Sequence, residues 1–328
     1  MASKRKLDSY FSPVGQKKPR ALAKNDEDRP VSAPKTYTEY SHHATYPFPV
    51  PYLPQSIVDA LSTVPATDGQ AINHQPDLDL LYFQPFVPKP AERDLFEFLR
   101  SELFFYRVNY KIKRGTFETD IHTPRYTTVF GVDTSAFFNE SGELVDGQSA
   151  KPVSKDRWNC QPRPLPQCLD HLRRLTEVFT GASYNFCLVN YYANGADSIS
   201  YHSDDERFLG PNPSIASFSL GAIRDFFMKH KPITPVAGEE PPEQNLKPPL
   251  KLPLSSGDMM LMRGKTQSCW LHSIPKRKGK GSEGDRINIT FRKGVKPYAT
   301  ENYMQYNVGN GEVYRWDART KEMRQWKE

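Results

Sequence analysis

The segment Arg286–Arg292 constrains the fold of this chain more than any other segment, because apolar and polar residues alternate in it without exception. In an extended conformation the apolar residues share one side and the polar residues the other: Ile287, Ile289 and Phe291 against Arg286, Asn288, Thr290 and Arg292. Such alternation usually marks a strand with one solvated face. If the polar face is buried instead, the arginines need an anion, because an unpaired buried charge is very costly. Arginine binds planar carboxylates through paired hydrogen bonds, so a small dicarboxylate would suit this face.

The other secondary-structure signals favour a mainly β protein with helices on its outside. Apolar residues at helical spacing predict helices over Pro90–Leu103 and Pro166–Thr180, and Gly181 is a plausible C-cap. Short aromatic and β-branched runs after Gly181 predict the strands Tyr184–Tyr192, Ile215–Leu220, Asp225–Lys229, Met259–Met262 and Arg286–Phe291. We therefore expect a sandwich of short strands with helices packed against it.

The two ends of the chain lack a clear periodic pattern. Residues 1–80 are rich in Lys, Pro, Ser and Asp, and we expect them to be mostly disordered. We place the folded domain at 81–296, with a Pro-rich inserted loop at about 231–253, and leave 297–328 as a tail of unknown role. No apolar run approaches the ~20 residues that a membrane helix needs, so we expect no membrane partner. The net charge of +6 suits a polyanionic partner.

Short motifs near the start of the chain point to a nuclear protein. Lys4–Lys6 and Lys17–Arg20 are basic clusters, which are typical of nuclear import signals, of nucleic-acid contacts and of solvated basic tails. Between them, Leu7, Tyr10 and Phe11 resemble the peptide that docks on the sliding clamp of replication, where one helical turn presents three anchors to a groove. The four cysteines show neither a disulfide framework nor zinc-ligand spacing, which agrees with a reducing compartment.

A candidate metal site lies in the acidic segment Tyr201–Glu206. Residues two apart in an extended segment point to the same side, so His202 and Asp204 can reach one ion. His272, which follows an apolar strand, is the candidate third ligand. Two histidines and one carboxylate leave coordination positions open, as in the facial triad of non-haem iron oxygenases, whereas structural zinc sites have four protein ligands. The alternative is a set of surface polar residues with ordinary hydrogen-bond partners.

Taken together, these motifs resemble the AlkB family, and most closely its eukaryotic branch that repairs alkylated DNA. The resemblance covers about 123–293 and rests on motifs in the family's order: Asn190–Tyr192, His202–Glu206, Ile215–Ser217, Leu220–Ala222, Arg224–Phe226, His272 and Arg286–Arg292. It implies a double-stranded β-helix, or jelly-roll, core with flanking helices. It also implies a catalytic Fe(II) bound by His202, Asp204 and His272, with 2-oxoglutarate and O2 as co-substrates. The implied 2-oxoglutarate site consists of Asn190, Tyr192, Arg286, Asn288, Thr290 and Arg292, with Arg292 on the distal carboxylate.

The resemblance further implies a nucleotide-recognition lid, which we place at about 107–131. Basic residues there can meet phosphates and aromatic residues can stack on a base, so the implied substrate contacts include Lys113, Arg114, Arg125 and Phe130. The stretch 113–122 departs from the family pattern. Glu206 matches the acidic position that reads the exocyclic group of a flipped base.

The activity implied by the resemblance is oxidative demethylation of N-alkylated bases in DNA, such as 1-methyladenine and 3-methylcytosine. Formaldehyde, succinate and CO2 would be released. The enzyme must flip the base or act on single strands, because the methyl group is otherwise hidden in the duplex. Three alternatives remain open: an RNA demethylase or protein hydroxylase on the same fold, a non-catalytic nucleic-acid-binding module, and a clamp-docked adaptor that uses only the N-terminal tail.

Overall fold

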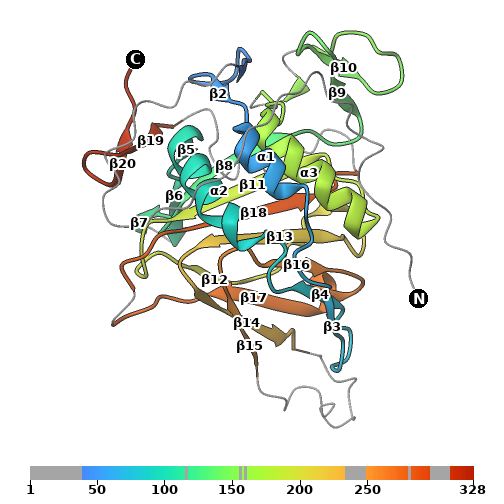
Figure 1. Cartoon of the computed structure of the whole chain (residues 1–328), viewed down its shortest axis with the longest axis vertical. Helices are drawn as coiled ribbons and strands as arrows, with labels where there is room; N and C mark the ends of the chain where they lie inside the picture. The colour runs from blue at the N-terminus through green and yellow to red at the C-terminus, as the bar shows by residue number, and fades with distance from the viewer. Residues whose placement is uncertain are drawn as a thin grey trace, which may run out of the picture.

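The computed structural model is built around two antiparallel sheets, with helices over one side (Figure 1). It describes residues 39–114, 117–154, 157–158, 161–232, 249–279, 282–295 and 311–328. Two stacked sheets with helices outside are the arrangement expected from the many short strands after Gly181. The mainly β fold class predicted from the sequence is therefore confirmed.

The larger sheet has ten strands in the order β20-β19-β5-β8-β11-β18-β13-β16-β4-β3. Their bounds are β3 Gln70–Ile72, β4 Leu80–Phe83, β5 Phe105–Tyr106, β8 Tyr126–Gly131, β11 Phe186–Tyr192, β13 Ile215–Gly221, β16 Met259–Met262, β18 Arg286–Arg292, β19 Val313–Asp317 and β20 Glu322–Gln325. Strand β18 lies at the centre, between β11 and β13, and its Asn288 is opposite Asn190 on one side and Ser219 on the other. The alternating segment that we singled out is thus the best-supported strand of the sheet.

The smaller sheet has four strands in the order β12-β17-β14-β15. They are β12 Ile199–His202, β14 Arg224–His230, β15 Leu250–Leu254 and β17 Trp270–Ile274. Three two-stranded sheets complete the strands: β1 Tyr40–Ser41 with β2 Val50–Pro51, β6 Asn109–Arg114 with β7 Phe117–His122, and β9 Ala136–Phe138 with β10 Leu144–Asp146.

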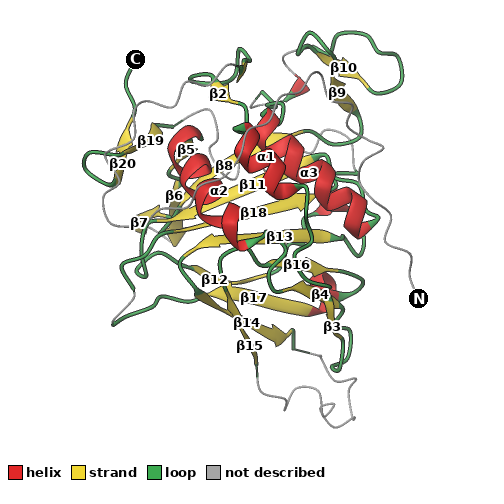
Figure 2. Cartoon of the chain, in the orientation of Figure 1, coloured by secondary structure: helices red, strands yellow, loops and turns green. Residues whose placement is uncertain are grey.

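Three helices lie across the outer face of the larger sheet (Figure 2). They are α1 Gln55–Leu61, α2 Lys89–Glu102 and α3 Gln167–Thr180; the short α4 Thr266–Cys269 and a 3-10 turn at Arg207–Leu209 lie elsewhere. Helices α2 and α3 confirm the two predicted helices, and α3 ends at Gly181 with a left-handed φ of 66°. The apolar side of β18 faces the core, where Ile287, Ile289 and Phe291 are all 0% exposed. No helix among the described residues has the length and apolar character to cross a membrane.

Three boundaries predicted from the sequence are wrong. Residues 39–80 are not disordered, because α1 and the strands around it contribute Val50, Leu53 and Ile57 to the core. The supposed loop at 231–253 contains most of β15, which pairs with β14. The described part of the C-terminal tail is not separate, since β19 pairs with β5 and extends the larger sheet. These short segments become ordered by pairing with distant strands, which local sequence patterns do not report.

Gly131, at the end of β8, has a φ of 98°, and a Cβ there would overlap the backbone carbonyl oxygen of Asn185. Gly181 also has a left-handed φ, but a Cβ there would meet nothing within 4 Å. We expect Gly181→Ala to lower the free energy of unfolding by about 1–2 kcal/mol, the usual cost of a left-handed residue. Gly131→Ala should lower it by clearly more, because steric overlap adds to that cost. Urea unfolding of both variants checks this, and equal losses would contradict the assigned overlap.

Candidate functional site

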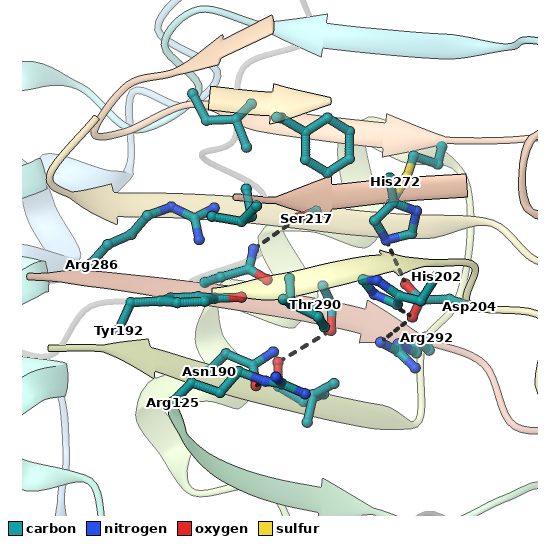
Figure 3. Close-up of a pocket in the computed structure, with 17 residues that line it drawn as sticks. Arg125, Asn190, Tyr192, His202, Asp204, Ser217, His272, Arg286, Thr290 and Arg292 are labelled. Carbon is teal, nitrogen blue, oxygen red and sulfur yellow. Dashed lines mark hydrogen bonds and ion pairs between the residues drawn. The ribbon is translucent and has the colours of Figure 1, made fainter. Parts of the chain in front are cut away.

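A pocket between the two sheets collects most of the predicted site residues (Figure 3). Strands β11, β13, β16 and β18 line it from the larger sheet, and β12, β14, β15 and β17 from the smaller one. The predicted residues that line it are Arg125, Asn190, Tyr192, His202, Asp204, His272, Arg286, Asn288, Thr290 and Arg292. The polar face of β18 therefore points into the pocket between the sheets.

His202, Asp204 and His272 meet at one end of this pocket. Strand β12 pairs with β17 so that His202 lies opposite His272. Asp204 lies two residues after His202, just beyond the end of β12. Asp204 Oδ1 is 3.9 Å from His202 Nε2, and Asp204 Oδ2 is 3.8 Å from His272 Nε2. The potential ligand atoms all lie within 4.8 Å of one another, so one ion can contact all three. His202 Nδ1 lies 2.9 Å from the carbonyl oxygen of Ser200, which favours a proton on Nδ1 and leaves Nε2 for a metal.

Burial and charge hold His272 and Asp204 in the form that a metal requires. Burial, together with the neighbouring His202, lowers the pKa of His272 to about 3, so its ring is neutral near neutral pH. Burial alone would raise the pKa of Asp204, but Arg292 and the two histidines lower it below its ordinary value. Metal ligands must be deprotonated, and neutral imidazole with ionised carboxylate meets that condition.

The opposite end of the pocket holds the buried guanidinium of Arg286 (Figure 3). Arg286 is 1% exposed, and its Nη2 donates a 2.9 Å hydrogen bond to Ser219 Oγ. Its Nε and Nη1 have no hydrogen-bond acceptor among the described residues. Burial lowers the pKa of Arg286 to about 10, which still leaves it charged near neutral pH. A carboxylate bound beside Arg286 would compensate this charge, so the pocket fits a metal at one end and a carboxylate at the other.

The position of Arg292 corrects one sequence prediction. Its Nη2 donates to Asp204 Oδ1 at 2.9 Å, and its Nη1 donates to Glu206 Oε1 at 3.0 Å. Arg292 therefore lies at the metal end of the pocket, although we expected it to bind the distal carboxylate of 2-oxoglutarate. Arg286 is the arginine whose position suits that carboxylate.

Polar side chains of Arg125, which directly precedes β8, and of strands β11 and β18 line the pocket between these two ends. Asn190 Oδ1 accepts hydrogen bonds from Arg125 Nε at 3.2 Å and from Thr127 Oγ1 at 2.9 Å. Asn288 Nδ2 donates to Ser217 Oγ at 2.9 Å. Asn288 Nδ2 also donates to the carbonyl oxygen of Phe218 at 2.8 Å, so both of its N–H donors are used. Asn190 accepts through Oδ1, and its Nδ2 can donate to a bound dicarboxylate.

Two further predicted residues complete this lining. Thr290 Oγ1 donates to the carbonyl oxygen of Leu188 at 3.2 Å. The ring of Tyr192 lies beside Arg286, with 5.3 Å between the ring centroid and Arg286 Cζ. Every residue of the predicted 2-oxoglutarate set is thus brought to one pocket.

The predicted substrate contacts are only partly brought together. Arg125 lines the pocket, but Phe130 is 0% exposed and packs in the core with its ring centroid 5.5 Å from that of Phe104. The prediction that Phe130 contacts the substrate is therefore wrong. The region predicted as the lid divides into the β6–β7 pair and strand β8, and β8 lies between β5 and β11 in the larger sheet, where Phe130 is buried. Lys113 and Arg114 lie on β6, and their side chains fall outside the described part of the chain. Glu206 accepts a bond from Arg292, and burial raises its pKa.

Sequence reasoning missed the apolar wall of the pocket: Leu188, Ile199, Phe226, Leu254, Met262 and Ile274. Leu188 could have been found, because it lies two residues before Asn190 and shares its face of β11. Phe226 stacks on His272, with ring centroids 5.3 Å apart and planes at 29°. That contact depends on the register between β14 and β17, which no local pattern encodes.

A jelly-roll pocket with two histidines and a carboxylate opposite a buried arginine defines a non-haem iron oxygenase that uses a 2-oxo acid. In agreement, residues 79–292 match the model of the 2OG-Fe(II) oxygenase superfamily. Within that superfamily, the chain belongs to the AlkB family. Membership implies Fe(II) as the cofactor and 2-oxoglutarate and O2 as co-substrates.

Three curated relatives illustrate the family. A protein of Arabidopsis thaliana named DNA oxidative demethylase ALKBH2 is 31% identical over 245 residues, which cover 72% of each protein. The human protein of the same name is 39% identical over 132 residues, or 40% of this chain and 48% of that protein. Human alpha-ketoglutarate-dependent dioxygenase alkB homolog 3 is 39% identical over 146 residues, or 43% of this chain and 48% of that protein. The match thus spans about half the length of the human relatives.

Asp204→Ala should abolish both Fe(II) binding and the conversion of 2-oxoglutarate to succinate, because it removes the only carboxylate of the cluster. Asp205→Ala is the matched control, since this neighbouring carboxylate is half exposed and pairs with Lys231 at 2.8 Å. Iron titration of the purified proteins and measurement of succinate check both variants. Tight iron binding by Asp204→Ala would refute the proposed ligand.

Substitution of the two buried arginines should have different kinetic effects, one on the 2-oxoglutarate requirement and the other on Fe(II) binding. Arg286→Ala removes a charged hydrogen-bond donor worth about 1.5–3 kcal/mol, so the 2-oxoglutarate requirement should rise about 10- to 100-fold. Arg292→Ala should instead weaken Fe(II) binding, because Asp204 loses its 2.9 Å partner. Succinate formation at varied 2-oxoglutarate and varied Fe(II) distinguishes the two. The reverse pattern would restore Arg292 as the carboxylate ligand.

Proposed function

We propose that this protein is a DNA oxidative demethylase that acts on N-alkylated bases such as 1-methyladenine and 3-methylcytosine. The observation that carries the proposal is the pocket with the cluster His202, Asp204 and His272 at one end and Arg286 at the other. The names of the two ALKBH2 relatives support DNA as the substrate. A net charge of +6 supports a polyanionic partner.

In this proposal each end of the pocket has its own task. His202, Asp204 and His272 bind Fe(II), and Arg292 orients Asp204. Arg286 binds the distal carboxylate of 2-oxoglutarate. When bound, Fe(II) and 2-oxoglutarate would activate O2 to oxidise the N-methyl group, and formaldehyde, succinate and CO2 would be released.

The base must leave the helical stack to reach this pocket, at a cost of roughly a few kcal/mol that is smaller for a damaged pair. Strand β7, which pairs with β6, ends three residues before Arg125, so the β6–β7 pair leads directly into the pocket wall. We assign phosphate contacts to Lys113 and Arg114 on this pair of strands. Glu206, which lies beside Arg292, would read the exocyclic group of the base.

Localisation and partners outside the oxygenase domain also belong to the proposal. The basic clusters near the start of the chain would direct the protein to the nucleus. Leu7, Tyr10 and Phe11 would dock on the sliding clamp and bring the enzyme to replicated DNA. These motifs lie outside the described residues, and their sequence is the support for both roles.

The direct test uses the protein with Fe(II), 2-oxoglutarate and ascorbate on a DNA oligonucleotide that carries one 1-methyladenine. We expect mass spectrometry to show loss of one methylene, dependent on both Fe(II) and 2-oxoglutarate. Asp204→Ala is the inactive control, and Asp205→Ala is the matched active one. Succinate without DNA repair would reject DNA as the substrate, and the same assay on methylated RNA would then test the alternative.

A further inference from the structure

A second cluster of metal-ligating side chains lies outside the pocket, where β14 ends and β17 begins. It consists of Asp77, His230 and Cys269, whose potential ligand atoms all lie within 4.8 Å of one another. His230 Nε2 is 3.6 Å from Asp77 Oδ2. Two ligands of a tetrahedral zinc ion with bonds of about 2.0–2.3 Å lie roughly 3.3–3.8 Å apart. The spacing of the imidazole and the carboxylate therefore already matches a shared ion.

The backbone around these three residues is tied together. The Lys231 N–H donates to the carbonyl oxygen of Cys269 at 2.7 Å, which holds the end of β14 against the start of β17. The indole Nε1 of Trp270 donates to the carbonyl oxygen of Pro76 at 3.0 Å, which holds the turn that carries Asp77. The cluster thus joins a turn before β4 of the larger sheet to the end of β14 and to the end of α4, directly before β17.

The imidazole of His230 has a nitrogen that a metal would satisfy. Its Nδ1 lies 2.7 Å from the carbonyl oxygen of Lys231, which favours a proton on Nδ1. Its Nε2 is buried and has no hydrogen-bond partner among the described residues. A protonated Nε2 would bond to Asp77 at about 2.7–2.9 Å, whereas the observed distance is 3.6 Å. A cation bound between His230 Nε2 and Asp77 Oδ2 would account for that separation. The hydrogen bond from Nδ1 to the carbonyl oxygen of Lys231 is the kind of bond that usually orients a metal-binding histidine.

The ammonium groups of the two neighbouring lysines, Lys231 and Lys265, do not occupy the position between the three candidate ligands. Lys231 Nζ is engaged elsewhere, at 2.8 Å from Asp205 Oδ2 and 3.1 Å from the carbonyl oxygen of Gln267. Lys265 Nζ is 3.3 Å from Asp77 Oδ1, but its side chain is 66% exposed and can turn into solvent. The other oxygen, Asp77 Oδ2, faces His230.

We propose that Asp77, His230 and Cys269 form a zinc site that is separate from the iron site and independent of the demethylase proposal. A sulfur ligand disfavours Ca²⁺ and Mg²⁺, and one thiolate, one imidazole and one carboxylate are all common Zn²⁺ ligands. The Cys269 thiol gives up its proton to solvent on binding. Three protein ligands leave the fourth position for water. The bound ion links the turn before β4 to the β14–β17 pair, which also carries His272.

Co²⁺ is the probe that distinguishes the two sites, because a cobalt–thiolate bond gives a near-ultraviolet charge-transfer band and the iron cluster contains no sulfur. The full-length His202→Ala variant, with its iron site disabled, should bind one Co²⁺ and show this band, and Zn²⁺ should displace it. Adding Cys269→Ser should abolish the band. Cys160→Ser is the matched control and should retain it.

The unmodified protein provides a second test that does not need a substitution. The unmodified protein should bind two Co²⁺ ions, one of them with the thiolate band, and bound Zn²⁺ should protect Cys269 from alkylation in peptide mapping. A saturated protein without a thiolate band would overturn the proposal. So would a band that survives in Cys269→Ser, since the sulfur would then come from another cysteine.

Discussion

Two buried positive charges on one strand are the constraint on which this structure depends. Arg286 and Arg292 are 1% and 2% exposed, and each guanidinium must be compensated inside the protein. Arg292 is compensated by Asp204 and Glu206 from the loop after β12, so that loop is drawn to the metal end of the pocket. Arg286 is left for a ligand. This difference between the two arginines distinguishes the two ends of the pocket, one for the proposed metal and the other for the proposed carboxylate.

The two sheets contribute different parts of this chemistry. The larger sheet supplies the polar face of β18 and its neighbours, backed by an apolar face under the helices. The smaller sheet supplies both histidines, which lie opposite each other on β12 and β17. All three candidate metal ligands therefore come from the smaller sheet and the loop after β12, and stacking of the sheets brings them to Arg292 of the larger sheet. Phe226, stacked on His272, connects the apolar wall to this cluster and fixes the ring that must face the ion.

The proposed zinc cluster occupies another junction between the same sheets. Asp77 comes from the turn before β4, His230 is the last residue of β14, and Cys269 is the last residue of α4, directly before β17. The same β17 carries His272 three residues after Cys269. An ion bound by Cys269 would therefore hold the start of the strand that presents the proposed iron ligand His272.

The sequence by itself determined the elements whose signals are local. Alternation marked β18, helical spacing marked α2 and α3, and the two-residue step from His202 to Asp204 marked the metal site. Tertiary structure decided the rest, because it depends on pairing between distant segments. Short strands at both ends of the chain are ordered only by their partners, Phe130 is buried because β8 lies inside the sheet, and strand register decided which arginine meets Asp204. The cysteine spacing gave no zinc pattern, since Asp77, His230 and Cys269 become neighbours only when the two sheets stack.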